Sequence, residues 1–367
     1  MPNLQPSSLK ICLIGTSLAN GGSNKNHALL SKLFSINGNV VWNVIVLDEV
    51  TFDYSGELLN LGKIKSKGIF NKMKRLLVLK RFLKEQKFDF IIDFRNKNSF
   101  VQEWLILQLL FKNENYIPTI RSFYTEFYFP GTDYLASKLY KNVFGIVTVS
   151  KAIEAKVKQR YQYENVVTIY NPLDIETLQN LANEPISFEK KYIISAGRMN
   201  DKENIKQFDL LIEAYSKSIL PQNNIQLVLL GNGFKEKKLP ELAEKLGISE
   251  HVVFLGFQEN PYKFYKNALF YVLTSKNEGF PTVINEAMAC GTPVVSFDCE
   301  SGPNEMIVPN ETGILVENQD FNDLIFQMNQ MILDEDNYLK IKKASNSRAE
   351  LHRFDKIYVD WLTFFKQ

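Results

Sequence analysis

The sequence predicts an α/β protein built from two doubly wound, Rossmann-like domains. The chain has 367 residues, which is more than one hydrophobic core usually supports. Short apolar runs rich in β-branched and aromatic residues alternate with helical or loop segments, and this series starts again near the middle of the chain. Such alternation is typical of a parallel sheet covered by helices, so we expect two sheets of this kind.

The first domain is expected at residues 1–172. A break follows the dipeptide Asn171-Pro172, because proline disfavours a helix at the preceding residue and a polar stretch leads from there to the next strand. Buried strands are predicted at residues 9–15, 40–47, 88–94, 116–120, 143–149 and 166–170.

The second domain is expected at residues 173–345, and residues 346–367 are expected to form a C-terminal helix. The end of that segment, YVDWLTFFKQ, is aromatic and amphipathic, so the helix should pack back onto a domain. Strands of the second domain are predicted at residues 192–197, 225–231, 252–256, 268–274 and 293–297.

Composition and charge exclude several classes of protein. Contents of 45% hydrophobic and 23% charged residues are typical of a soluble globular protein. The net charge of +2 argues against a nucleic-acid-binding protein, because such domains usually carry a marked basic excess. The leader before the first strand is too short and too uncharged for a secretory signal, and no run approaches about 18 apolar residues. We therefore expect a cytoplasmic protein.

Cysteine and histidine chemistry is not indicated. The three cysteines lack metal-ligand spacing and lie in or beside apolar elements, so we expect buried free thiols. The three histidines are far apart in sequence, and none pairs with Cys or Asp at a ligand spacing, which favours neither a zinc site nor a Ser-His-Asp set. These residues are Cys12, Cys290, Cys299, His27, His251 and His352.

The most informative motif, SKNEGFPTVINEAMACG, places Glu278 and Glu286 eight residues apart across a strand-to-helix junction. Pro281 is expected at the first helical position, and Gly291 supplies the left-handed stop. Ligands of open parallel sheets bind outside the carboxyl ends of the strands. Both carboxylates can therefore border one crevice beside free backbone N–H groups, where a phosphate ligand would fit. Alternatively, they only complement the helix dipole, which is worth about 0.3–1 kcal/mol each and requires no ligand.

A second motif, SAGRMNDKENIKQFDLLIEAY, opens the second domain and supplies two cations. Arg198 follows a predicted strand, and Lys206 stands directly before an amphipathic helix, so both can point into the crevice that holds Glu278. A diphosphate is the ligand that such a pair favours. Lys202 is the alternative lysine, and either lysine could be an ordinary solvated residue.

Gly21 and Gly22 follow the first strand and precede a helix expected to begin near Asn24. Paired glycines let the backbone approach a ligand, although a tight turn explains them equally well from local chemistry. The GxGxxG pattern is absent, which disfavours a nicotinamide enzyme.

Together, the strings EGFP at 278–281, EAMACGTPVV at 286–295 and SGPNE at 301–305 closely resemble the donor-site signature of the retaining glycosyltransferases of family 4, within the glycosyl transferases group 1. The resemblance is strongest over residues 192–314 and weaker before residue 143. It implies the GT-B fold, in which two Rossmann-like domains face each other across a cleft and the C-terminal tail crosses to the N-terminal domain.

The same resemblance implies a role for each matching residue. Glu278 would contact the transferred sugar near its reacting carbon, and Glu286 would bind the ribose hydroxyls. Arg198 and Lys206 would hold the donor phosphates and stabilise the departing nucleoside diphosphate, so no metal ion or other cofactor is expected. Backbone groups at Phe257 would bind the base, while the side chain of that residue could belong to the core. The implied donor-binding set is Gly21, Gly22, Phe257, Gly279, Phe280, Pro281, Thr282, Val283 and Glu286, beside the catalytic set Glu278, Arg198 and Lys206.

The resemblance therefore implies a retaining glycosyltransferase that moves a hexose or N-acetylhexosamine from a UDP-sugar to a saccharide acceptor, in the synthesis of a cell-envelope polysaccharide or glycolipid. The aromatic-rich residues 121–131 (RSFYTEFYFPG) could line the acceptor site or belong to the core. Two other functions remain open. A UDP-sugar epimerase of the same fold would need further acid–base carboxylates and no acceptor, and a non-catalytic nucleotide- or glycan-binding module would not hydrolyse a donor.

A basic run at residues 63–84 contains nine Lys or Arg and no acidic residue. A helix in this run would be basic and amphipathic, which indicates peripheral attachment to an anionic membrane surface. The alternative is a helix packed on the core with a solvated cationic face. The expected partners are thus a nucleotide-sugar donor, a saccharide or lipid-linked saccharide acceptor and, through this run, the inner face of the membrane.

Overall fold

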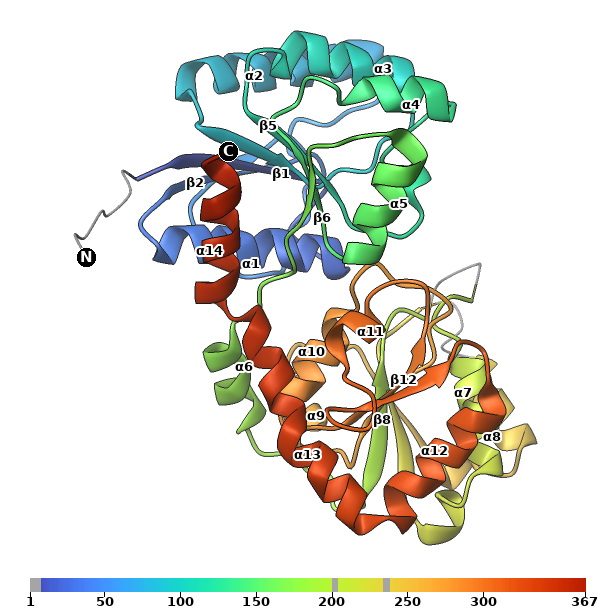
Figure 1. The fold of residues 1–367 in the computed structure, drawn as a ribbon. Coiled ribbons are helices and arrows are strands. Elements are labelled where there is room, and N and C mark those ends of the chain that lie inside the picture. Colours follow the sequence, from blue (N-terminus) through green and yellow to red (C-terminus); the bar gives the residue numbers. More distant parts are fainter. Residues whose placement is uncertain (1–7, 200–203, 234–237) are drawn as a thin grey trace, which may run out of the picture. The chain divides into compact units, whose positions relative to one another are not determined.

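The computed structural model describes residues 8–199, 204–233 and 238–367. The chain divides into two compact units, each with its own sheet and core (Figure 1). The first unit comprises Met1–Pro172 together with Phe354–Gln367, and the second comprises Leu173–Arg353.

The sheet of the first unit has seven strands in the order β3-β2-β1-β4-β5-β6-β7, and all recorded pairings are parallel. The strand order reverses between β1 and β4, as in a doubly wound sheet. The six predicted strands are present, and β3 at the sheet edge is an additional one. The bounds are β1 Lys10–Gly15, β2 Val40–Ile45, β3 Glu57–Asn60, β4 Phe90–Asp93, β5 Tyr116–Ile120, β6 Ile146–Thr148 and β7 Val166–Thr168.

Helices cover both faces of this sheet. In α1 the apolar residues Leu30, Leu33 and Phe34 recur at helical spacing and are buried in the core of the first unit. The helical elements are α1 Gly22–Ile36, α2 Ile69–Gln86, α3 Phe100–Ile106, a π-helical turn Leu107–Phe111, a 3₁₀ turn Thr125–Phe127, α4 Asp133–Leu139 and α5 Lys151–Tyr161.

The C-terminal helix α14, Phe354–Phe365, completes the core of the first unit. Its Trp361 packs edge-on against Phe34, with ring centroids 5.7 Å apart, and the Tyr358 hydroxyl accepts a hydrogen bond of 3.0 Å from Asn39 Nδ2. The aromatic spacing of the tail therefore serves to bury one helical face.

The expected start of this tail at residue 346 is wrong. Helix α13, Glu335–Ala349, runs through that position, and the 3₁₀ turn Glu350–His352 after it still belongs to the second unit. The Leu173 N–H donates to the His352 carbonyl at 2.8 Å, which ties the turn to the beginning of the second unit. The chain leaves its helical conformation only at Arg353.

The sheet of the second unit has six parallel strands in the order β10-β9-β8-β11-β12-β13, and its order reverses between β8 and β11. The five predicted strands are present, and β13 is an additional edge strand. The strands are β8 Tyr192–Ala196, β9 Gln226–Leu230, β10 Val252–Gly256, β11 Tyr271–Leu273, β12 Val294–Asp298 and β13 Ile314–Glu317.

Helix α7 shows why the second core forms where it does. Its residues Phe208, Leu211, Ile212 and Tyr215 recur at helical spacing and are buried against the sheet. The helices are α6 Ile175–Ala182, α7 Phe208–Lys217, α8 Lys238–Lys245, α9 Tyr262–Asn267, α10 Thr282–Ala289, α11 Pro303–Met306, α12 Phe321–Leu333 and α13, with 3₁₀ turns at Pro221–Asn223 and Ser249–His251.

No helix in residues 8–199, 204–233 and 238–367 combines the length and the apolar character needed to cross a bilayer.

Candidate functional site

The predicted catalytic residues lie at the point where the strand order of the second sheet reverses. Arg198 follows β8, and Glu278 lies in the loop after β11, the neighbouring strand. Open parallel sheets bind ligands at the carboxyl ends of the strands on either side of such a reversal. The topology therefore brings together residues that are 80 positions apart in sequence.

Lys206 and Glu278 form an ion pair, with 2.5 Å between Nζ and Oε1. Their side chains are 24% and 14% exposed, so the pair is partly shielded but open to solvent on one side. The stem of Lys206 lies against Gly197, where a Cβ atom would come within 3.3 Å of the Lys206 Cε atom. The Gly-Arg dipeptide after β8 thus leaves room for the lysine beside it.

The loop that carries Lys206 is attached to the loop that carries Glu278. The Thr274 hydroxyl donates to the Lys206 carbonyl at 2.9 Å, and the Lys276 N–H donates to the Ile205 carbonyl at 2.8 Å. These bonds fix Lys206 as the lysine beside Glu278. The alternative, Lys202, lies outside the described residues.

Arg198 is exposed, and no carboxylate lies within ion-pair distance of it in the described part of the chain. The backbone next to it is held in place, since the Met199 N–H donates to the Asn232 carbonyl at 2.9 Å. An exposed guanidinium on a held backbone is therefore available to an anionic ligand.

Helix α10 begins at Thr282, and no side chain caps its N-terminus. Pro281 was expected at the first helical position, but it is the N-cap residue one position before the helix, because its ψ of 88° is not helical. The glycine stop is confirmed, since Gly291 has a φ of +77°. The uncapped N–H groups at the start of α10 can donate hydrogen bonds to an anion.

A second loop supports the residues before α10. The Ser301 hydroxyl donates to the Gly279 carbonyl at 2.7 Å. Gly302 has a φ of +103°, and a Cβ atom there would come within 2.4 Å of Pro281 Cδ. The Ser-Gly-Pro part of the SGPNE string thus holds the EGFP loop in shape, and only glycine fits at Gly302.

Glu286 is 3% exposed and lies in the second turn of α10. Burial first, and then the charges of Glu278 and Glu286, raise the pKa of the Tyr271 phenol, so both carboxylates act on one side chain. The Tyr271 hydroxyl in turn accepts a bond from the Ala196 N–H and donates to the Ala196 carbonyl, each at 3.0 Å. Tyr271, the first residue of β11, is thus bonded to the last residue of β8.

The side chains of Phe280 and Phe257 differ in their exposure to solvent. The Phe280 side chain is 7% exposed and packs edge-on against His352, with ring centroids 5.3 Å apart. Phe257 follows β10 and is 61% exposed, so the core alternative for this side chain is wrong. An exposed ring at a sheet edge is open to a planar ligand.

In the first unit, Gly21 and Gly22 join β1 to α1. Gly21 is the N-cap with a φ of +90°, and Gly22 is the first helical residue, two positions before the expected start. The Asn24 amide donates to the carbonyls of Ala19 and Asn20, at 2.6 and 2.9 Å, and so closes the turn. Asn24 was not a predicted site residue, although its place behind two glycines is a local signal.

The buried histidines are kept neutral. Burial lowers the pKa of His27 to about 3 and that of His352 to about 4. His27 bonds Asn43 Oδ1 at 3.1 Å and stacks on Phe94, which is a packing role in α1.

Cys12 and Cys299 are buried free thiols, as predicted, whereas Cys290 is only partly buried. Burial raises the pKa of the Cys290 and Cys299 thiols to about 12. Residues 8–199, 204–233 and 238–367 contain no cluster of three or more His, Cys, Asp or Glu suited to a metal ion.

Two buried polar atoms near α10 lack a hydrogen-bond partner within the described ranges: the Ser275 hydroxyl and the Asn285 amide oxygen. Ser275 is 0% and Asn285 2% exposed, so each atom is in the position of a group that a ligand or a water molecule would satisfy. Sequence reasoning missed both, because a serine and an asparagine in an apolar run carry no distinctive pattern.

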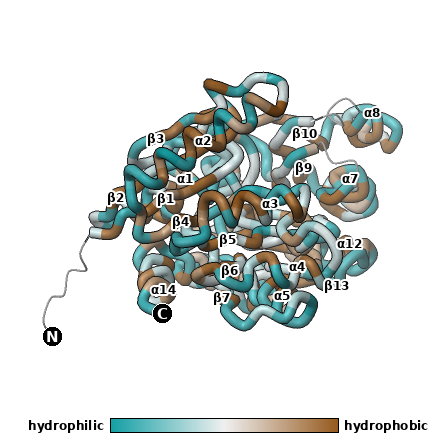
Figure 2. The backbone as a smooth tube through the Cα atoms, turned by 90° about the horizontal axis from the view of Figure 1, so that it is seen from above, coloured by the Kyte–Doolittle hydropathy of each residue, from teal (hydrophilic) through white to brown (hydrophobic). Residues whose placement is uncertain are grey.

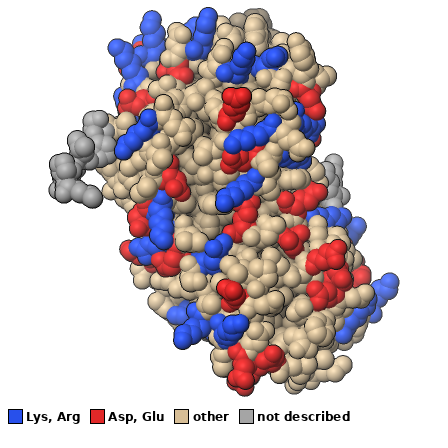
Figure 3. All heavy atoms as spheres, viewed as in Figure 1, with Lys and Arg blue, Asp and Glu red and all other residues tan. Residues whose placement is uncertain are grey.

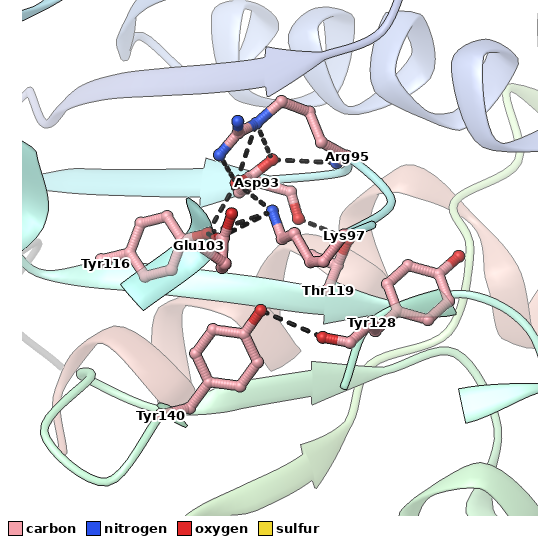
Figure 4. Close-up of polar contacts among 8 residues, drawn as sticks. All are labelled: Asp93, Arg95, Lys97, Glu103, Tyr116, Thr119, Tyr128 and Tyr140. Atoms are coloured by element: carbon pink, nitrogen blue, oxygen red, sulfur yellow. Dashed lines mark hydrogen bonds and ion pairs between the residues drawn. The ribbon is translucent and has the colours of Figure 1, made fainter. Parts of the chain in front are cut away.

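A buried charged network at the end of β4 was also missed (Figure 4). Asp93 Oδ2 lies 2.5 Å from Lys97 Nζ and accepts a bond of 2.6 Å from the Tyr116 hydroxyl, while Arg95 binds both Asp93 oxygens. Burial alone would raise the pKa of Asp93, but Arg95 and Lys97 outweigh it and hold that pKa well below its usual range. The pattern Asp-x-Arg-x-Lys after a buried strand is the signal that could have revealed the network.

Residues 179–348 match the protein family described as "Glycosyl transferases group 1". A relative from Campylobacter jejuni, N-acetylgalactosamine-N,N'-diacetylbacillosaminyl-diphospho-undecaprenol 4-alpha-N-acetylgalactosaminyltransferase, is 33% identical over 62% of this chain and 60% of its own length. The chain thus spans less than two thirds of that relative.

Two solved structures share the fold of the whole chain. TarM has a TM-score of 0.79 at 16% identity and covers 99% of this chain and 100% of its own. Anabaena HepE in complex with UDP has a TM-score of 0.75 at 18% identity and covers 98% of this chain and 100% of its own. These likenesses show that the chain has the GT-B fold.

Proposed function

We propose that this chain, whose residues 179–348 form a glycosyl transferases group 1 domain, is a retaining glycosyltransferase of family 4. It moves a hexose or N-acetylhexosamine from a UDP-sugar to a saccharide acceptor in the synthesis of a cell-envelope polysaccharide or glycolipid. The Campylobacter relative acts, by its name, on a diphospho-undecaprenol-linked saccharide, which supports a lipid-linked acceptor. The UDP in the HepE complex supports UDP as the nucleotide.

One observation carries the proposal: Lys206 and Glu278 of the EGFP loop form an ion pair at the reversal of the second sheet, where Arg198 follows the neighbouring strand β8. Two cations and an uncapped helix N-terminus favour a diphosphate. A carboxylate in the same place suits the hydroxyls of a sugar attached to that diphosphate. A nucleotide-sugar supplies both groups in one molecule.

The proposed chemistry is electrostatic. The bond from the anomeric carbon to the diphosphate oxygen breaks, a bond from that carbon to the acceptor oxygen forms, and the acceptor proton passes to the leaving diphosphate. Arg198, Lys206 and the N–H groups of α10 stabilise the negative charge that grows on the diphosphate. Glu278 stabilises the transferred sugar, and buried Glu286 holds the ribose hydroxyls. This scheme needs no metal ion, because the cations are side chains.

Hydrolysis of nucleotide sugars by the purified chain tests the proposal. A panel of UDP-, GDP- and ADP-sugars is incubated without an acceptor, and release of nucleoside diphosphate is measured. We expect slow hydrolysis of at least one UDP-sugar, and a rate roughly ten- to a hundredfold lower with Glu278→Gln. Conversion of a UDP-sugar to its epimer without diphosphate release would favour the epimerase, and binding of UDP without either reaction would favour a non-catalytic module.

Peripheral attachment to an anionic membrane through α2 is part of the proposal. Helix α2 lacks acidic residues until Glu85, and its first half exposes Phe70, Met73 and Leu77 by 85, 56 and 64%. These side chains line a shallow hollow with Lys74, Val78 and Arg81. An apolar stripe flanked by cations suits a surface of anionic lipid.

The neighbouring helix extends this apolar surface. Helices α2 and α3 lie side by side on the face of the first unit that is turned to the viewer in Figure 2. Trp104 and Leu109, in α3 and the π-helical turn after it, are 46 and 47% exposed. Lys and Arg side chains gather at the same end of the first unit (Figure 3). The alternative of a fully core-packed helix fits only the second half of α2, where Leu79 and Leu83 are buried.

A further inference from the structure

Arg121 is a partly buried cation that directly follows β5, at the carboxyl edge of the first sheet. Its guanidinium carbon lies 5.0 Å from the centroid of the Phe94 ring, and its Nη2 donates to Asn171 Oδ1. The ring fixes the plane of the guanidinium and the amide fixes its direction. The bond to Asn171 uses one of the five N–H donors of the group.

The other buried cations at this edge have carboxylate partners. In the network of Figure 4, Asp93 and Glu103 face Arg95 and Lys97, so two negative charges stand against two positive ones. Arg121 is not part of this network. In the described part of the first unit, no carboxylate lies within ion-pair distance of its guanidinium, and the Tyr128 phenol and the His27 imidazole are ionisable groups that interact with it electrostatically.

A shielded cation without a counter-charge is costly. Burial lowers the pKa of Arg121 to about 10, which is the direction expected when no acid compensates for lost water. Buried charges in proteins are normally paired, so an unpaired one beside a ligand-binding edge indicates a place for an anion. A planar guanidinium with free donors on its edge matches two oxygens of a phosphoryl group at once.

We propose that Arg121 binds a phosphoryl group of the acceptor. The inference rests on the proposed function, in which the acceptor is a lipid-linked saccharide. The donor diphosphate has its own cations, Arg198 and Lys206, in the second unit, whereas Arg121 belongs to the first. The site therefore selects acceptors in which a phosphate or diphosphate joins the saccharide to its lipid.

Titration calorimetry with two probes tests this site. The parent protein is the full chain with Arg198→Gln and Lys206→Gln, so that the donor cations do not bind the probe. The probes are inorganic pyrophosphate and geranyl diphosphate, which carries the same phosphoryl groups on a short lipid. We expect Arg121→Gln to weaken binding of geranyl diphosphate by roughly ten- to a hundredfold, as for a lost hydrogen bond to a charged group.

Matched variants separate the contribution of the bidentate guanidinium geometry from that of the positive charge. Arg121→Lys keeps the charge and loses the bidentate geometry, so we expect an intermediate loss. Lys141→Gln, which removes an exposed cation from the same unit, should leave binding unchanged. If Arg121→Gln does not fold by circular dichroism, Arg121→Lys and Asn171→Ala provide the comparison, since the first keeps the positive charge and the second keeps the guanidinium while removing its hydrogen-bond partner.

Unchanged binding of geranyl diphosphate by folded Arg121 variants would overturn the site. Binding of pyrophosphate at least as tight as that of geranyl diphosphate would overturn its assignment to the acceptor, because a free-phosphate site gains nothing from a lipid. Neither result depends on glycosyl transfer. If the protein does not hydrolyse any nucleotide-sugar, the proposed function is contradicted, but the titration still reports whether Arg121 binds a phosphoryl group.

Discussion

Replacing Glu278 with glutamine is the most direct test of the site. The substitution keeps the shape of the side chain and removes the charge that lies 2.5 Å from Lys206 Nζ. A hydrogen bond to a charged group contributes about 1.5–3 kcal/mol, and if that contribution is made to the transition state, turnover falls roughly ten- to a hundredfold. UDP affinity should be kept or rise slightly, because the diphosphate no longer competes with Glu278 for the ammonium group.

Glu286→Gln is the matched perturbation, since Glu286 is 3% exposed in α10 and is assigned to the ribose. Its loss should raise the donor KM and weaken UDP binding by a similar factor while kcat changes less. Glu244→Gln removes an exposed charge from α8 in the same unit and should change neither quantity.

The assay combines calorimetry with UDP and steady-state release of UDP from the donor found in the hydrolysis panel. Wild-type turnover by folded Glu278→Gln would refute the reasoning. A loss of UDP affinity as large as that of Glu286→Gln would also refute it, because Glu278 would then act on the ground state rather than on the transition state.

Three further predictions follow from the same structure. UDP should raise the melting temperature in the presence of excess chelator, since Arg198 and Lys206 supply the cations; stabilisation only with added magnesium or manganese would contradict this. Neutralising Lys72, Lys74, Arg75 and Lys80 should reduce co-sedimentation with anionic liposomes, as should added salt, because each cation near the surface contributes about 1 kcal/mol; equal sedimentation of the variant would remove the membrane assignment. Acidification from about pH 7 to about pH 5 should lower the unfolding free energy by roughly 2 kcal/mol through His27. The pKa of His27 falls to about 3 on folding, so the unfolded chain binds more protons than the folded chain below about pH 6.5. His27→Gln should flatten this pH dependence in denaturant titrations, and an unchanged slope would argue against a neutral buried His27.

The strands were predictable where an apolar run is continuous, and two were not. Strands β3 (ELLN) and β13 (ILVE) are four residues long and pair with a neighbour on one side only. A short edge strand buries little, so its sequence carries a weak pattern, and only the pairing with β2 or β12 defines it.

Helix α2 shows that hydrophobic periodicity predicts a helix but not which of its apolar residues are buried. The run at residues 63–84 predicted a basic amphipathic helix, and α2 forms from Ile69 onward. The sequence could not decide between a core face and an exposed one, and the structure contains both, with Leu83 3% and Phe70 85% exposed. Which half of a helix is covered depends on elements far away in the sequence.

The candidate site was predictable where its residues are neighbours in sequence, as in the EGFP loop and α10. Three contacts of the site join segments that are 22 to 75 positions apart: Lys206 with Glu278, Ser301 with Gly279, and Tyr271 with Ala196. Such contacts follow from strand order, which a single sequence gives only through the alternation of its elements.

The distribution of titratable groups gives the site its chemical character. Burial keeps His27 and His352 neutral and raises the pKa of the thiols of Cys290 and Cys299, so these groups do not gain or lose protons readily near neutral pH. His352 packs on Phe280 and therefore supports the EGFP loop mechanically. In the proposed site, a donor would instead meet charges and dipoles, namely the guanidinium of Arg198, the ammonium of Lys206 and the N-terminus of α10. Groups of that kind stabilise a leaving diphosphate without exchanging a proton with it. Transfer of a sugar from a nucleotide-sugar requires this stabilisation from the protein.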